Sequence, residues 1–173
     1  GSARSKVQSS YGDPLPYIAK DQALFCVASD EFHVFLIEDY YATIFYDLIQ
    51  GDTVTAVLLV DQELEESLHS FYGPSSAELR YAFERQALDL INVVRMQNNK
   101  VPLKWHDSVA DLARKHSQDM AERNFFAHIN PDGKSPSQRI AAAGLLYWSA
   151  GENIAMGQPS AIFAHEALFN SPG

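Results

Sequence analysis

The sequence is poor in cysteine and in clustered positive charge. Its 173 residues include one cysteine, Cys26, and 13 Lys and Arg against 22 Asp and Glu, so the formal net charge is −9 at pH 7. A single cysteine cannot form a disulfide within the chain, and the redox compartment therefore cannot be inferred from it. Because Cys26 lies in the apolar run 23–27, we expect a small buried side chain rather than a reactive thiol. An acidic chain without a basic run disfavours nucleic acids and anionic membranes as partners.

Long apolar runs are also missing. No uninterrupted stretch approaches the ~20 residues that cross a bilayer, so we expect no transmembrane segment. The chain opens on Gly1-Ser2-Ala3, without a charged segment followed by an apolar one, so no signal peptide is expected. A hydrophobic content of 46% with 20% charged residues is typical of a globular protein with a core. The length fits one or two small domains.

The first half of the chain predicts an antiparallel sheet. Four segments rich in β-branched and aromatic residues are separated by short turns, a pattern typical of a meander. Such a sheet needs a cover over its apolar face, which short helices at 3–10 and 62–70 are expected to provide. The four expected strands are 23–28, 32–38, 40–47 and 53–60.

The second half predicts helices. Gly73-Pro74 breaks the chain, and Ser75 with Glu78 predicts a capping box at the start of a helix that carries one apolar stripe. A second capping box is expected at 135–138, with Gly144 as the C-cap of its helix. The stripe is Leu79, Phe83, Ala87, Leu90 and Val94, and further helices are expected to begin at Asp107 or Ser108 and to span 159–169.

Eight short motifs in the second half follow the order and spacing of one family. The most informative are Asn124-Phe125-Phe126-Ala127-His128 and Gly151-Glu152-Asn153-Ile154-Ala155. Together they make the region 78–173 similar to the bacterial branch of the CAP superfamily (cysteine-rich secretory proteins, antigen 5, pathogenesis-related 1). The other six motifs are Asn92-Val93-Val94-Arg95, Val101-Pro102-Leu103-Lys104-Trp105, His116-Ser117-Gln118-Asp119-Met120, Pro131-Asp132-Gly133-Lys134-Ser135-Pro136, Gln138-Arg139 and Asn170-Ser171-Pro172-Gly173.

The first half is similar to the module that precedes the CAP domain in some secreted Bacillus-type proteins, the CAP-associated N-terminal domain. The residues that carry this resemblance are 1–7, 11–15 and the expected strands. Together the two resemblances imply an α+β chain. A partial antiparallel β-meander module at 1–74 is followed at 75–173 by a CAP-like α-β-α sandwich that lacks its terminal strands. They also imply an extracellular or cell-envelope location.

The CAP resemblance implies a cleft lined by two His and two acidic residues. His128 matches the first cleft His and Glu152 the first cleft Glu, whereas the second acidic position falls at Ser171. The second His is expected directly after Gly173, the last residue of the sequence. His128 is thus a candidate metal ligand whose partner is missing, and zinc is a candidate cofactor of a longer chain only.

His128 and Glu152 admit more than one function. A His–Glu pair in a cleft is suited to metal binding or acid–base work, but it is also compatible with a structural hydrogen bond. The leading expectation is non-catalytic binding of a lipid, peptide or glycan. The alternative is a metal-assisted, peptidase-like hydrolase with Glu152 as base. A third is docking of a partner by the sheet module alone, and whether the chain is an enzyme stays open.

Three further polar sites have simpler expected roles. His116 lies on an apolar helix face, which favours a hydrogen-bonded core histidine. The pair His165-Glu166 is expected on a helix surface, because position 169 is not the second His of a zinc-protease helix. Arg139 is expected either to pair with a carboxylate such as Glu152 or to cap a helix. The two tryptophans, Trp105 and Trp148, are expected to pack in the core or at its rim.

Overall fold

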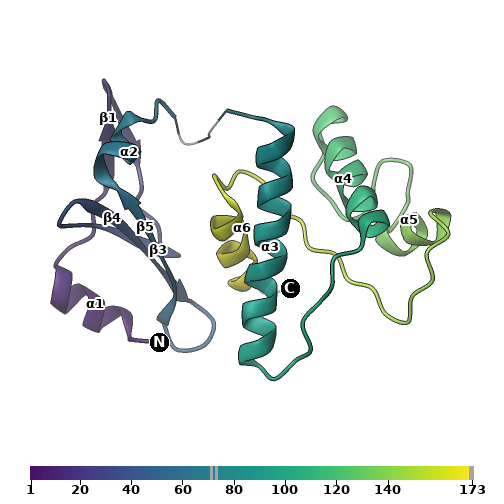
Figure 1. Ribbon diagram of the computed structural model, residues 1–173, viewed down its shortest axis with the longest axis horizontal. Coiled ribbons are helices and arrows are strands. Elements are labelled where there is room, and N and C mark those ends of the chain that lie inside the picture. The colour runs from purple at the N-terminus through teal and green to yellow at the C-terminus, as the bar shows by residue number, and fades with distance from the viewer. Residues whose placement is uncertain (71, 73, 172–173) are drawn as a thin grey trace. The chain divides into compact units, whose positions relative to one another are not determined.

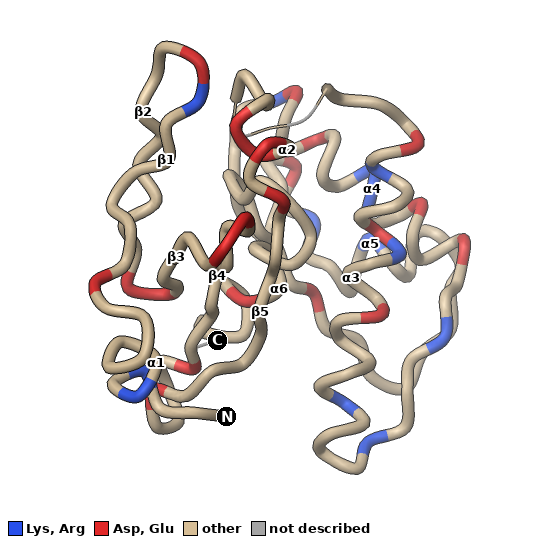
Figure 2. Tube along the Cα trace, turned by 60° about the vertical axis from the view of Figure 1, so that its left-hand side comes forward, with Lys and Arg blue, Asp and Glu red and all other residues tan. Residues whose placement is uncertain are grey.

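The computed structural model describes residues 1–70, 72 and 74–171 (Figure 1). They form two compact units, which we call unit 1 (Gly1–Leu90 with Gly157–Gly173) and unit 2 (Ile91–Met156). The domain boundary expected between residues 74 and 75 stays a prediction, since units of packing need not coincide with family domains. Along the described trace, Lys and Arg are scattered among more numerous Asp and Glu (Figure 2). No helix among the described residues is long and apolar enough to cross a bilayer.

The strands of unit 1 form two antiparallel sheets, one with two strands and one in the order β3-β4-β5. The three-stranded sheet confirms the predicted meander, and its strands agree with the expected segments to within one residue. The segment expected at 23–28 instead pairs with β1, a strand that the pattern missed because it is short and follows Pro14 and Pro16. The strands are β1 (Tyr17–Lys20), β2 (Ala23–Cys26), β3 (Phe32–Ile37), β4 (Tyr40–Asp47) and β5 (Thr53–Asp61).

The central strand β4 organises the core of unit 1. It is buried at every residue from Tyr41 to Tyr46, because both of its faces are covered. Helix α1 (Arg4–Tyr11) places Val7 against Ile44 and Tyr46 on one face. The β1-β2 hairpin covers the opposite face, and α2 (Gln62–Ser67) follows β5. Both short helices were predicted, α1 to within one residue, whereas α2 ends three residues earlier than expected. Cys26 at the end of β2 is exposed, so its expected burial is wrong, because the edge of this hairpin stays open.

Helix α6 (Ala161–Phe169) belongs to unit 1 and packs on the three-stranded sheet. The ring of Phe163 contacts Phe32 and Phe45 edge-on, with centroids 5.2 and 5.0 Å apart. The carboxylate of Glu166 is buried and accepts a hydrogen bond of 2.5 Å from the Thr55 hydroxyl. The expectation that His165-Glu166 lies on the helix surface is therefore wrong, because this side of α6 faces the sheet.

Unit 2 is built from helices and loops, and residues 91–156, all described, contain no strand. The helices are α3 (Ala77–Gln97), which contributes to both units, α4 (Asp107–Glu122) and α5 (Pro136–Ala142). The predicted apolar stripe of α3 is half-buried along its length. Because unit 1 contains the antiparallel sheets and unit 2 is built from helices, the predicted fold class α+β is confirmed.

Two helix starts were predicted from capping patterns. One is confirmed, and the other lies one residue later in the sequence than predicted. Ser76, not Ser75, accepts the hydrogen bond of 3.0 Å from the Leu79 N–H, because α3 begins one residue later than expected. At α5 the capping box is confirmed, since Ser135 Oγ and the Gln138 side chain bond each other's backbone N–H at 3.3 and 2.8 Å. Gly144, at φ +69°, follows the last turn of α5, where the left-handed backbone favours glycine.

Replacing Ser135 by Ala tests this cap. The Ser135→Ala change removes the hydroxyl that accepts from the Gln138 N–H, so the free energy of unfolding should fall by about 1 kcal/mol. Urea unfolding followed by circular dichroism measures the loss. The matched control is Ser137→Ala on the exposed side of the same turn, which should cost less than about 0.5 kcal/mol. Equal losses for the two variants would contradict the capping assignment.

Candidate functional site

His128 and Glu152 meet in unit 2, although 24 positions separate them in the sequence. His128 Nδ1 lies 3.0 Å from Glu152 Oε1. Because a carboxylate oxygen only accepts, Nδ1 carries the proton of this hydrogen bond and Nε2 is left with its lone pair when the imidazole is neutral. The His128 side chain is 53% exposed.

Arg139 holds both partners of this pair. Its guanidinium lies 2.5 Å from Glu152 Oε2 and donates a hydrogen bond of 2.8 Å to the backbone carbonyl of His128. A third bond of 2.9 Å reaches the Lys134 carbonyl. Of the two roles left open for Arg139, the structure therefore gives pairing with Glu152. The capping box at Ser135 fixes the residue at which α5 begins. Arg139 on this helix thereby reaches the loop that carries His128.

The Glu152 carboxylate is ionised and fully engaged. Burial by itself would raise the pKa of Glu152, but hydrogen bonds from Arg139 and His128 and the positive charge of Arg139 outweigh it, so this pKa lies below its ordinary value of 4.5. Each oxygen has a partner, Oε1 with His128 and Oε2 with Arg139. A carboxylate held in this way orients the imidazole and is poorly suited to take a proton from a substrate.

His116 lies behind the pair, on α4. It is buried as predicted, and its Nε2 lies 3.1 Å from the Ala127 carbonyl and 3.9 Å from Glu152 Oε1. Its Nδ1 is buried without a hydrogen-bond partner among the described residues. The helical spacing of Leu112, His116 and Met120 indicated an inward side chain but did not indicate that it faces Glu152.

The two tryptophans differ. Trp105 is half-buried and donates a hydrogen bond of 2.8 Å to Asp107, in keeping with rim packing. Trp148 is fully exposed, so the expectation that it packs in the core or at its rim is wrong. It stands on the loop between α5 and Glu152, where the described residues of unit 2 do not cover it.

Comparisons with protein families identify both parts of the chain. Residues 88–173 match the model of the cysteine-rich secretory protein family, CAP, and residues 1–71 match that of the CAP-associated N-terminal domain. The chain belongs to the CAP family.

Individual relatives of this CAP chain come from Bacillus. It is 36% identical over 101 residues to the uncharacterized protein YkwD of Bacillus subtilis (strain 168), covering 58% of this chain and 38% of that protein. It is 37% identical over 90 residues to the uncharacterized membrane protein YlbC of the same strain, covering 52% of this chain and 26% of that protein. The chain thus spans well under half the length of these relatives.

A solved structure shares the fold. It is a crystal structure of an extracellular protein containing a SCP domain from Bacillus anthracis str. Ames, matched with a TM-score of 0.80 at 23% identity. The match covers 98% of this chain and 61% of that one. At this identity the likeness establishes the fold of the CAP chain and not its activity.

The described residues of this CAP chain do not fit a zinc site. A zinc ion takes three or four protein ligands. Among the described residues no group of three or more His, Cys, Asp or Glu is placed to hold a metal. At the candidate site the described residues bring His128 and Glu152 together, and no third metal ligand adjoins them.

Ser171, the third predicted cleft residue, lies in unit 1. It is exposed and follows α6, with its N–H donating to the Leu168 carbonyl at 3.2 Å. Its role in the CAP cleft stays a prediction. The His expected after Gly173 lies beyond the sequence, and Gly173 itself lies outside the described residues.

The depressed pKa of Glu152 predicts a pH-dependent stability. The ionised carboxylate contributes stability above its unfolded pKa of 4.5, and this contribution is lost as the pH falls toward the lower folded pKa. Glu152→Gln should therefore be less stable than the parent chain at neutral pH, and the difference should shrink as the pH falls below 4.5. Urea unfolding across this range measures it.

The control for this prediction is Glu63→Gln, which changes an exposed carboxylate on α2. At neutral pH its free energy of unfolding should lie within about 0.5 kcal/mol of that of the parent chain. A constant difference between Glu152→Gln and the parent chain would contradict the assigned carboxylate network.

Proposed function

We propose that this CAP chain binds a polar polymer, a peptide or a glycan, without cleaving it, and that the His128 imidazole is its principal contact. The observation that carries the proposal is the double engagement of Glu152 by Arg139 and His128. It engages both oxygens of Glu152, the residue that the hydrolase alternative assigns as base, and leaves the His128 ring half-exposed. The exposed Trp148 on the adjoining loop offers the aromatic surface on which sugar rings and peptide side chains pack.

Of a lipid, a peptide and a glycan, the lipid has the least support at this site. The groups that meet there are an imidazole, a carboxylate and a guanidinium, which favour hydrogen-bonding ligands. Burial stabilises an acyl chain in proportion to the apolar area that is removed from water, so contact with these polar groups would add little binding free energy.

The proposal includes an extracellular or cell-envelope location. The similar Bacillus anthracis protein is described as extracellular, and YlbC is described as a membrane protein. A peptide- or glycan-binding site would meet such polymers at the cell envelope.

A metal-assisted hydrolase is the second candidate function. One observation favours it: metal-binding imidazoles are commonly oriented by a carboxylate on their other nitrogen, as Glu152 orients His128. It requires ligands beyond those among the described residues. Elemental analysis of the protein purified from its own host separates the candidates, because stoichiometric zinc would favour the hydrolase.

Titration with two probes tests binding. An N-acetylglucosamine oligosaccharide and a short peptide are each titrated into the labelled chain by nuclear magnetic resonance. We expect one of them to shift the signals of His128 and Trp148 and to be recovered intact by mass spectrometry. His128→Ala should weaken that binding at least about tenfold, the effect of losing a hydrogen bond plus contact area.

The matched control is His106→Ala, at an exposed histidine of the same unit, which should bind as the parent chain does. Cleavage of either probe that is lost in His128→Ala would favour the hydrolase instead. If neither probe shifts these signals, the proposed function is wrong.

A further inference from the structure

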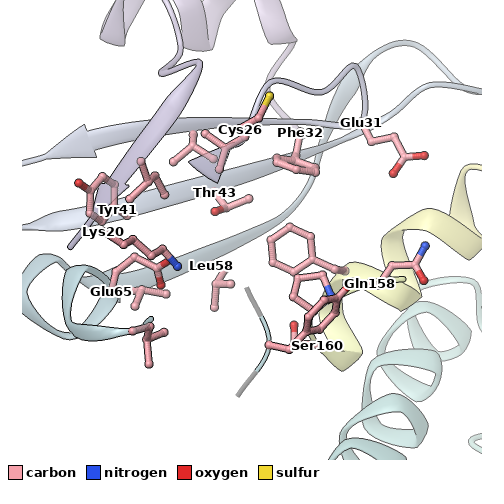
Figure 3. Close-up of a pocket in the computed structure, with 18 of the residues that line it drawn as sticks. Lys20, Cys26, Glu31, Phe32, Tyr41, Thr43, Leu58, Glu65, Gln158 and Ser160 are labelled. Carbon is pink, nitrogen blue, oxygen red and sulfur yellow. The ribbon is translucent and has the colours of Figure 1, made fainter. Parts of the chain in front are cut away.

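Unit 1 contains a pocket of about 600 Å³ that none of the motifs indicated (Figure 3). Its floor is the sheet face that carries Val34, Thr43 and Leu58, and Phe163 of α6 forms part of its wall. The hairpin of β1 and β2 adds Ile18. Pockets of about 300–1,000 Å³ with mainly apolar walls are the usual sites of small molecules. In size and lining this pocket is therefore suited to a ligand with an apolar body.

The charges in the pocket exclude an anionic ligand. Among the described residues that line it, Lys20 is the one lysine or arginine. It is 2% exposed and places its ammonium 2.5 Å from Glu65 Oε1. Lys20 and Glu65 thus compensate each other, and Glu31 adds a further negative charge. A carboxylate or phosphate would have to displace Glu65 from a buried lysine, at the cost of leaving one buried charge uncompensated. An uncharged ligand meets no such cost.

One polar group in the wall is left without a partner. Ser160 Oγ is buried, and no described residue forms a hydrogen bond with it. Buried hydroxyls in native proteins nearly always have a partner, so an isolated one suggests a bound molecule or water. In Figure 3 Ser160 and Thr43 lie around the same space, on opposite sides of the pocket. A ligand with a hydroxyl or carbonyl would satisfy Ser160 while its apolar part covers the sheet.

We propose that this pocket binds an uncharged, chain-like amphiphile with one terminal hydroxyl or carbonyl, of the class of long-chain alcohols. The apolar walls select the chain, the Lys20–Glu65 pair disfavours an anionic head, and Ser160 binds the polar end. This site is separate from the one built on His128 and does not depend on the proposed function.

Cys26 provides a reporter, since it is the single cysteine of the chain, is exposed and lines the pocket. The rate at which N-ethylmaleimide modifies Cys26 is followed by mass spectrometry, with 1-decanol or decanoate at equal concentration. We expect 1-decanol to slow the modification in a saturable way and decanoate to have a much smaller effect. Absence of protection by 1-decanol overturns the site, and equal protection by decanoate overturns the ligand class.

Two neighbouring residues of β5 give a matched pair of variants. Leu58→Trp fills the pocket and should abolish protection by 1-decanol. Leu59→Trp changes the next residue, which is 60% exposed and is not part of the lining, and should keep it. Retained protection in Leu58→Trp, with the fold verified by circular dichroism, would place the ligand elsewhere and overturn the proposal.

Ser160→Ala tests the polar end without filling the pocket. Because the hydroxyl has no partner among the described residues, its loss should leave the melting temperature unchanged or slightly higher. The affinity for 1-decanol should fall roughly two- to tenfold, the range expected for one neutral hydrogen bond. Unchanged affinity would overturn the role given to Ser160, and with it the preference for a terminal hydroxyl or carbonyl.

Discussion

The arrangement of unit 2 depends on the ion pair between Arg139 and Glu152. This pair connects α5 to the segment that carries Glu152, and through His128 it fixes the loop that follows α4. Apolar packing alone is a weak constraint here, because His116 is the one fully buried residue in the range 91–156, all of which is described. Removing one partner from a largely buried ion pair is costly, because the other partner is left as an uncompensated charge. The polar network therefore defines the geometry of the candidate site.

Unit 1 is held together by a different kind of interaction. Its central strand β4 is buried on both faces, and α6 joins the same sheet through Phe163 and through the buried carboxylate of Glu166. Residues that match the CAP family thus complete the core of the unit that holds the N-terminal module. The pocket beside α6 lies in this hydrophobic unit, whereas the His128 site lies in the polar one, which accounts for the different ligand chemistry proposed for each.

Features that depend on neighbouring residues could be predicted from the sequence, and features that depend on distant ones could not. Segments rich in β-branched and aromatic residues between short turns located β3 to β5. The Ser135 capping box was recognisable because its partners lie three residues apart. The burial of Glu166 depends on Thr55, 111 positions away, and no local pattern reports such a pairing. At the candidate site the motifs indicated His128 and Glu152, but the engagement of both Glu152 oxygens and the approach of His116 emerge only in three dimensions.

The central claim is that Glu152 fixes the His128 imidazole with the proton on Nδ1, so that Nε2 is presented outward as an acceptor. Two-dimensional ¹⁵N–¹H correlation spectra of the histidine rings, recorded where the imidazole is neutral, report which nitrogen carries the proton. The account predicts the Nδ1–H tautomer for His128 in the parent chain and its loss in Glu152→Ala, which removes the acceptor of the Nδ1–H bond. A predominant Nε2–H tautomer in the parent chain would contradict the account, because Glu152 would then not orient the ring.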